Sequence, residues 1–215
     1  MNKKALIVSG GWDGHKPHEM AQLAAGWLRE KNFTVDLRDS LEIFADAAAL
    51  TVYDLIVPNW TMGSLTGEQE QGLTSAVEAG TGLGGWHGGM GDAFRANTNY
   101  QFMVGGQFVS HPDNEKDYEV VITKSDDPIV AGLSNFVIHS EQYYLHFDPA
   151  NEVLVTTTFQ TQSAPWVNGT VMPVVWKKHW GAGRVFYSAL GHQPSVFDIP
   201  EAREIQIRGL LWASR

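Results

Sequence analysis

The sequence predicts one α/β domain over residues 1–215, with a parallel sheet covered by helices on both faces and an antiparallel extension. Strand and helix patterns alternate through the first half of the chain, which is typical of a parallel sheet. The second half carries several strand patterns with few helices between them. A length of 215 residues corresponds to one domain, since domains hold roughly 100–200 residues. No repeat, low-complexity tract or linker divides the chain.

The first half begins with an apolar run over 5–8 that predicts a buried strand feeding a glycine-rich loop. Pro17 suits the first turn of the next helix, and apolar residues follow at helical spacing as far as Leu28. Thr66 and Gln69 resemble a capping box one residue out of register, and Gly80 ends the helix that they open. Further strands are predicted over 33–37, 53–57 and 83–86, and a further helix over 88–94.

The second half reads as strands over 118–122, 153–159, 171–177 and 184–190. Gly181, Ala182 and Gly183 mark a hairpin turn between the last two. A helix over 201–212 follows, with apolar Ile205, Leu210 and Trp212.

Composition excludes several classes of function. The absence of cysteine rules out disulfides, thiolate nucleophiles, iron–sulfur clusters and cysteine zinc sites. A net charge of −9 disfavours nucleic acid as a partner, because a surface that binds phosphates needs the opposite sign. No apolar run approaches the roughly 20 residues that span a bilayer, and the run after Lys4 is too short for a signal peptide. We therefore expect a cytoplasmic protein without a membrane partner.

Histidines gather where ligands bind in open α/β sheets, which is outside the carboxyl ends of the strands. The segments concerned follow the predicted strands or lie in the connections between them. Six of the eight histidines lie in or near these segments: His15, His18, His87, His111, His139 and His192. His146 and His179 fall on predicted strands and are taken as structural.

His87 occupies the centre of a Gly85-Trp86-His87-Gly88-Gly89 turn after a predicted strand. The pattern matches the G-x-Ser-x-G elbow that presents the nucleophile of many hydrolases, with histidine in the place of serine. A histidine there could act as a general base, a metal ligand or a hydrogen-bond partner of a substrate. The alternative is a glycine-rich turn whose histidine faces solvent.

The remaining candidates allow two interpretations each. His15 and His18, three residues apart, could reach a metal from one helical turn, or be exposed loop histidines. Glu141 could ligate a metal or transfer a proton, or be a solvated edge residue beside the tyrosines at 143 and 144. The tryptophans predicted at strand ends could stack on sugar rings or pack in the core: Trp12, Trp60 and Trp86.

The chain resembles the trehalose-utilisation (ThuA-like) family along nearly its whole length. The shared features are the Gly85–Gly89 turn, the Gly105–Pro112 segment, the Glu141–Tyr144 segment and, most specifically, the run from Gly181 to His192. The resemblance implies a flavodoxin-like fold similar to that of class I glutamine amidotransferases. Those enzymes carry a cysteine where this chain has His87, and His192 matches their later histidine. A thioester mechanism is excluded here because the chain has no cysteine.

The resemblance implies a role in sugar catabolism, with a disaccharide or keto-sugar as the substrate. We expect His87, His192 and Glu141 to be catalytic by acid–base or metal-assisted chemistry. The residues expected to bind substrate are Trp12, His18, Trp60, Trp86, His111 and Tyr144. If a divalent metal is bound, zinc is the expected ion, and the expected ligands are His87, His111, Glu141 and His192.

Two other functions remain open at this point. The chain could be a sugar-binding or regulatory protein without catalysis, in which case the three strand-end tryptophans would matter more than the histidines. It could also be a metal-dependent amide or ester hydrolase. Aromatic residues over 94–108 would suit a homodimer.

Overall fold

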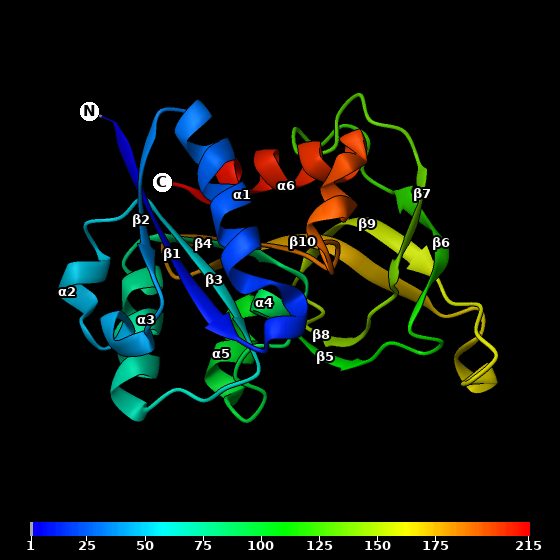
Figure 1. Cartoon of the computed structure of the whole chain (residues 1–215), viewed down its shortest axis with the longest axis horizontal. Coiled ribbons are helices and arrows are strands. Elements are labelled where there is room, and N and C mark those ends of the chain that lie inside the picture. The colour runs from blue at the N-terminus through cyan, green and yellow to red at the C-terminus, as the bar shows by residue number, and fades with distance from the viewer. Residues whose placement is uncertain (1) are drawn as a thin grey trace.

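The computed structural model describes residues 2–215 and shows the α/β architecture that the sequence predicts (Figure 1). The parallel part is built from strands β1 (Lys3–Gly11), β2 (Phe33–Arg38), β3 (Leu55–Thr61), β4 (Gly82–Trp86) and β11 (Gly183–Ser188). Their order in the sheet is β2-β1-β3-β4-β11, and each neighbouring pair is parallel. This is the flavodoxin-like order, with the switch point between β1 and β3.

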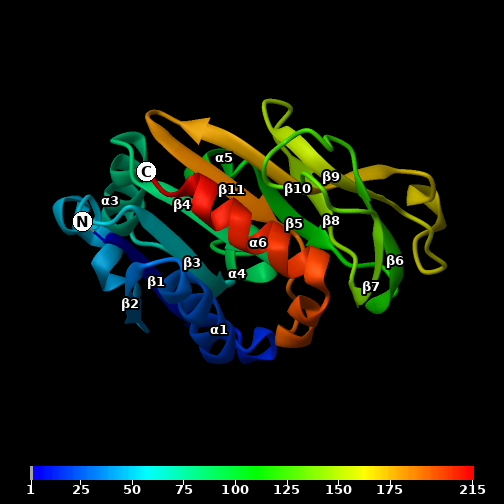
Figure 2. The ribbon, with the colours of Figure 1, turned by 90° about the horizontal axis from the view of Figure 1, so that it is seen from above.

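The sheet continues without a break into the antiparallel extension. Its further strands, in spatial order, are β10 (Val171–Trp180), β9 (Glu152–Thr158), β6 (Glu115–Ile122) and β7 (Phe136–Glu141). Seen from above, the parallel strands form one end of the molecule and β6, β7 and β9 form the other (Figure 2). A separate antiparallel pair joins β5 (Gly106–Ser110) to β8 (Tyr144–Phe147). The predicted hairpin is confirmed, since Trp180 pairs with Gly183.

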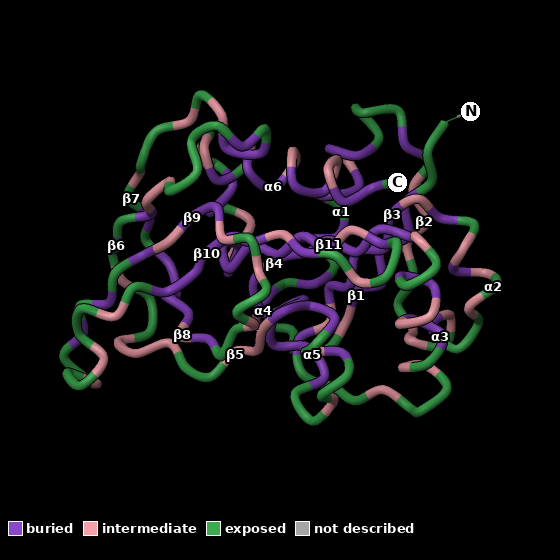
Figure 3. Tube along the Cα trace, turned by 180° about the vertical axis from the view of Figure 1, so that it is seen from behind, coloured by how far each residue is buried: buried purple, intermediate pink, exposed green. Residues whose placement is uncertain are grey.

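Helices cover both faces of the parallel part. α1 (Pro17–Glu30) packs on β1 and α6 (Pro200–Ala213) packs on β4 and β11. The opposite face carries α3 (Gly67–Glu78), α4 (His87–Gly91) and α5 (Thr98–Val104), with the short α2 (Ala47–Leu50) beside α3. The burial pattern follows these layers, since the central strands are buried and the connecting loops are exposed (Figure 3).

Local signals in the sequence account for most of these elements. Pro17 stands at the first turn of α1, whose buried positions recur every three or four residues. The capping box of α3 is complete and in register: the backbone amide of Gln69 donates to the Thr66 hydroxyl, and the Thr66 amide donates to the Gln69 side chain.

One predicted helix is shorter than expected. The sequence predicts a helix over 88–94, whereas α4 ends at Gly91. Ala93 instead forms a bridge with Met62, and Phe94 adopts a left-handed conformation with φ of 50°. Pairing with the loop after β3 therefore ends the helix early. Within residues 2–215, none of the helices combines the length and the apolar character that crossing a bilayer requires.

Candidate active site

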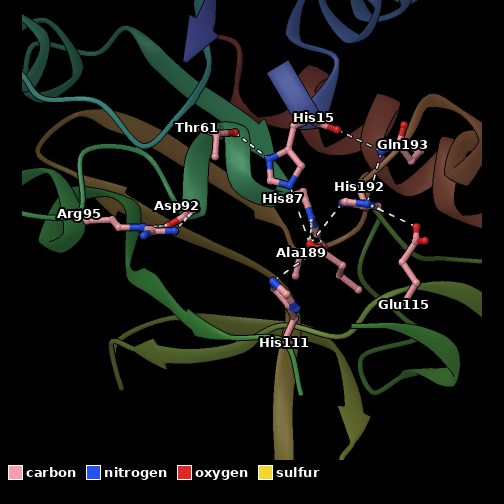
Figure 4. Close-up of polar contacts among 12 residues, drawn as sticks. His15, Thr61, His87, Asp92, Arg95, His111, Glu115, Ala189, His192 and Gln193 are labelled. Carbon is pink, nitrogen blue, oxygen red and sulfur yellow. Dashed lines mark hydrogen bonds and ion pairs between the residues drawn. The ribbon is translucent and has the colours of Figure 1, made fainter. Parts of the chain in front are cut away.

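Three histidines follow three parallel strands and meet at the carboxyl edge of the sheet (Figure 4). His15 ends a 3-10 turn just after β1, and His87 is the first residue of α4, directly after β4. His192 lies in the loop that follows β11. The ring centroids of the three histidines lie 4.9–5.3 Å apart. The strand-end rule therefore locates this group of side chains correctly.

His87 is held at a tight elbow between β4 and α4. Its φ is 40°, a left-handed conformation that non-glycine residues rarely adopt and that often marks a functional site. Glycine follows it where space is short, since a Cβ on Gly88 would lie 2.3 Å from Cε1 of His15. The elbow thus brings the backbone of α4 against the ring of His15 and aims His87 into the same space.

Glu141, the last residue of β7, places its carboxylate among the three rings. Its Oε2 atom lies 3.1 Å from Nε2 of His87, 3.2 Å from Nδ1 of His192 and 3.8 Å from Nε2 of His15. One potential ligand atom from each residue lies within 4.8 Å of the others, and all four residues are buried. We call His15, His87, Glu141 and His192 the histidine–glutamate cluster.

The second ring nitrogen of each histidine also faces a polar atom. Nδ1 of His87 donates to the carbonyl oxygen of Ala189 at 2.8 Å. Nδ1 of His15 lies 2.8 Å from the Thr61 hydroxyl, and Nε2 of His192 lies 3.4 Å from a carboxylate oxygen of Glu115. These contacts fix the orientation of the rings and leave the opposite nitrogen of each directed toward Glu141.

Burial and mutual contact shift the ionisation of the cluster. Burial lowers the pKa of His87 to about 4, so the ring is neutral at pH 7. Burial also acts to raise the pKa of Glu141, but the imidazoles of His15, His192 and His87 around its carboxylate outweigh it and hold that pKa well below its usual range. The carboxylate is therefore ionised. Nε2 of His87 lies within hydrogen-bond distance of this carboxylate, while Nδ1 of the same ring directs its proton to the Ala189 carbonyl.

The aromatic side chains that contact the cluster differ in how much of each is exposed to solvent. The Tyr143 ring stacks on His87 at 3.9 Å between centroids and is itself buried. His111 lies nearer solvent, with 33% of its side chain exposed and its Nε2 atom 3.6 Å from Oε1 of Glu141. Trp12 is 47% exposed and meets His15 edge to face. His111 and Trp12 are thus more exposed than the cluster that they contact.

Other predicted substrate-binding residues lie outside this arrangement. His18 is exposed on α1 and lines a separate cavity of about 230 Å³ with Leu37, Arg38 and Asp39. Trp86 is buried, and Tyr144 packs edge to face on Phe159.

Trp60 is half-buried and packs against the backbone of the loops around it. A Cβ on Gly10 would lie 2.5 Å from the Trp60 ring, and one on Gly63 would lie 2.7 Å from its Nε1 atom. The contacts of Trp60, Trp86 and Tyr144 are those of packing residues, and their roles in substrate binding stay predictions.

Three residues near the cluster were absent from the predicted site. His15 carried a signal, because it follows a strand in a glycine-rich loop, but its spacing from His18 suggested a shared helical turn that the structure does not contain. Tyr143, rather than Tyr144, contacts His87. Glu115 carried no signal, since it opens a strand with the mixed sequence Glu-Lys-Asp.

Comparisons with known proteins agree with this architecture. The family model described as "Trehalose utilisation" (ThuA) matches residues 4–213. A structure described as a ThuA-like protein from Parabacteroides merdae superposes with a TM-score of 0.80 at 18% identity, over 99% of this chain and 90% of that chain. A cytoplasmic protein from Salmonella typhimurium gives 0.68 at 16% identity, over 99% of this chain and 100% of that chain. No curated protein sequence matches the chain.

A part of a larger enzyme shares the fold as well. The β-galactosidase of Bacillus circulans superposes with a TM-score of 0.56 at 15% identity, over 99% of this chain and 30% of that chain. At such identities these structures establish the fold alone.

Proposed function

Since the chain belongs to the ThuA family of trehalose utilisation, we propose that it is an enzyme of sugar breakdown that acts on a disaccharide or its keto derivative at the histidine–glutamate cluster. The family supplies the class of substrate. The site supplies the chemistry, and one observation carries the proposal: four buried ionisable side chains converge at the carboxyl edge of the sheet.

Such a cluster is costly for stability, which favours a functional role. Removing charged groups from water costs free energy that hydrophobic packing would not require. The cluster also combines strongly shifted pKa values with a strained backbone at His87. Perturbed ionisation and strain gather at active sites, where the geometry serves the reaction.

A keto-sugar suits this site because its carbonyl group acidifies the neighbouring C–H bond. A base takes that proton, the C–H electron pair becomes the double bond of an enolate, and the carbonyl electrons move onto oxygen. Where that carbon carries a hydroxyl, its O–H proton moves to the enolate oxygen, a new carbonyl forms there and the former carbonyl carbon takes up the proton, which is isomerisation. The enolate can instead re-form the carbonyl while its C=C electron pair forms a new double bond to the next carbon. The glycosidic C–O bond on that carbon then breaks, and its oxygen takes up the proton and leaves as a free sugar.

We assign the proton transfer to His111 and the positioning of the carbonyl group to the cluster. His111 is the histidine beside the cluster that solvent reaches, whereas the His87 side chain is only 1% exposed. A general base must come within hydrogen-bond reach of the proton that it removes. The exposed face of Trp12 offers a surface on which a sugar ring can stack, beside His15.

A substrate panel tests the proposal. The panel holds keto-disaccharides and their parent disaccharides, and the readout is release of free sugar together with the absorbance of the unsaturated ketone. We expect turnover of a keto-disaccharide by the wild-type protein and its loss in His87→Ala. His139→Ala is the matched control, because His139 is exposed and its ring pairs with Asp117 rather than with a cluster residue.

Three outcomes would overturn the proposal. Failure of the wild type to convert any member of the panel removes the enzymatic function. Sugar binding without turnover, retained in His87→Ala, would identify a sugar-binding protein instead. Full turnover by a His87→Ala variant whose circular dichroism matches the wild type would move the chemistry away from the cluster.

A further inference from the structure

The ligand atoms of the histidine–glutamate cluster are spaced as the ligands of a metal ion are. The three ring nitrogens lie 3.1, 3.2 and 3.8 Å from Oε2 of Glu141. A tetrahedral zinc ion with bonds of about 2.0–2.1 Å holds its nitrogen and oxygen ligands about 3.3–3.4 Å apart. The three nitrogen–oxygen distances come close to that spacing, and all four ligand atoms lie within 4.8 Å of one another.

The contacts around the cluster are also those of a metal centre. A histidine that ligates a metal through one nitrogen usually donates its other N–H to a carboxylate, a backbone carbonyl or a similar acceptor. His87 donates to the Ala189 carbonyl, and His192 turns its outer nitrogen to the Glu115 carboxylate. The outer nitrogen of His15 contacts the Thr61 hydroxyl. One nitrogen of each ring thus makes a contact that orients the ring, and the other nitrogen is available to bind a metal ion.

The atoms that face one another inside the cluster are not all joined by hydrogen bonds. Within the described part of the chain, the buried Nδ1 atom of His192 has no hydrogen-bond partner, although Oε2 of Glu141 is 3.2 Å away. Nε2 of His87 lies 3.1 Å from the same carboxylate oxygen, and its Nδ1 proton already goes to the Ala189 carbonyl, so a neutral ring offers that oxygen no proton. A cation among these atoms would satisfy all of them.

We infer that the histidine–glutamate cluster binds one divalent transition-metal ion, with zinc the best match, through His15, His87, His192 and Glu141. Three imidazole nitrogens and one carboxylate oxygen suit zinc and its first-row neighbours, whereas magnesium and calcium prefer oxygen ligands throughout. The set differs in one member from the one expected from the sequence. His15 takes the place of His111, whose Nε2 atom lies 3.6 Å from the other oxygen of Glu141.

The metal deepens the proposed function, and its chemical role rests on that function. An enolate oxygen beside the bare Glu141 carboxylate would be repelled. A metal ion at the cluster would reverse the local charge and polarise the carbonyl group of a bound keto-sugar. His111 would then remain free to move the proton.

The test is metal binding by protein purified without a histidine tag. The chain is stripped with a chelator and titrated with zinc by calorimetry, and its metal content is measured by elemental analysis. We expect one zinc per chain, no binding of magnesium or calcium, and an affinity lowered more than about a hundredfold in His15→Ala and Glu141→Ala, since even outer contacts account for tenfold or more. His139→Ala should bind as the wild type does.

Metal binding measured on the wild-type protein is enough to overturn the inference, so the test does not depend on whether the variants fold. A folded wild-type chain that takes up no zinc, cobalt or manganese would show that the cluster is a proton-linked network of imidazoles and carboxylate. Zinc binding that survives unchanged in a folded His15→Ala variant would place the metal elsewhere. Zinc binding without sugar turnover would retain the metal site and remove the proposed function. Turnover by fully stripped protein would retain the proposed function and remove the metal's role in it.

Discussion

The parallel part of the sheet and its antiparallel extension contribute different chemistry to the same site. His15, His87 and His192 all come from the parallel part, each just beyond the carboxyl end of a strand. Both carboxylates come from the extension, Glu141 at the end of β7 and Glu115 at the start of β6. Imidazoles from one region thus meet carboxylates from the other.

The difference shows how a common fold acquires its own chemistry. The parallel part follows a general rule of open α/β sheets, and its histidines occupy the places where many such proteins bind ligands. The extension obeys no such rule. It brings an ionised carboxylate to the edge of the parallel strands, and the loop from β5 into β6 brings His111. These two residues give the site its charge and its accessible base. We therefore expect substitutions in the two regions to have separable effects.

The largest effect on turnover without an effect on zinc binding is expected at His111, which lies on the extension's side of the cluster. His111→Ala should lower turnover of the keto-sugar by roughly 10²–10⁴-fold, the usual contribution of a general base. Zinc stoichiometry should stay at one per chain, because His111 is outside the ligand set. Steady-state kinetics and elemental analysis of the same preparation check both statements. Unchanged turnover would transfer the proton step to a cluster residue, and lost zinc would make His111 a ligand.

A substitution at Gly88 perturbs the packing of the parallel part without replacing any of the proposed metal ligands. In Gly88→Ala the new Cβ would stand 2.3 Å from the ring of His15 and 3.0 Å from the Tyr143 hydroxyl. We expect a loss of about 1–3 kcal/mol in the free energy of unfolding, as for other overpacked sites, together with weaker zinc binding. Denaturant unfolding and calorimetry measure the two.

Gly26→Ala is the matched control for this substitution. Gly26 lies within α1, and a Cβ there would have no neighbour within 4 Å. Alanine should stabilise the helix by about 0.5–1 kcal/mol. Equal effects of the two substitutions would mean that the packing of α4 against His15 is not what holds the elbow.

The smallest expected effect belongs to Glu115, the second carboxylate of the extension. Glu115→Gln removes the charge behind His192 and should weaken zinc binding about tenfold, the low end for such contacts, because half of the Glu115 side chain is exposed. Glu119→Gln, on an exposed position of the same strand, makes the same change of charge away from the cluster. If both variants bind zinc as the wild type does, His192 needs no carboxylate to orient it.

The contrast between the two regions also explains which elements and site residues could be predicted from the sequence. Local signals were sufficient for the parallel part, because Pro17, the Thr66 capping box and the apolar strands act over a few neighbouring residues. The same signals placed His87 and His192 at strand ends. His15 was visible as a candidate, but its burial depends on Gly88, a residue distant in the sequence that no local pattern connects to it.

The extension was harder to predict because its strands are short and their pairing is not local. The pairs β5–β8 and β6–β9 join segments that lie far apart in the chain. The alternation of a strand could not predict which of Tyr143 and Tyr144 points toward the cluster either. Strand β7 ends at Glu141 and β8 begins at Tyr144, so the two tyrosines do not lie on one continuous strand. The resemblance to a family, and not periodicity, brought Glu141 into the predicted site.

The place of β11 in the sheet has a consequence for how the protein is made. This strand pairs in parallel with β4 and antiparallel with β10, so it is the seam between the two regions, yet it lies near the C-terminal end of the sequence. During synthesis the two regions cannot form one continuous sheet until residues 183–188 have been made. His192 emerges only a few residues later. The ligand set can thus assemble only after the segments that carry its other members have been made.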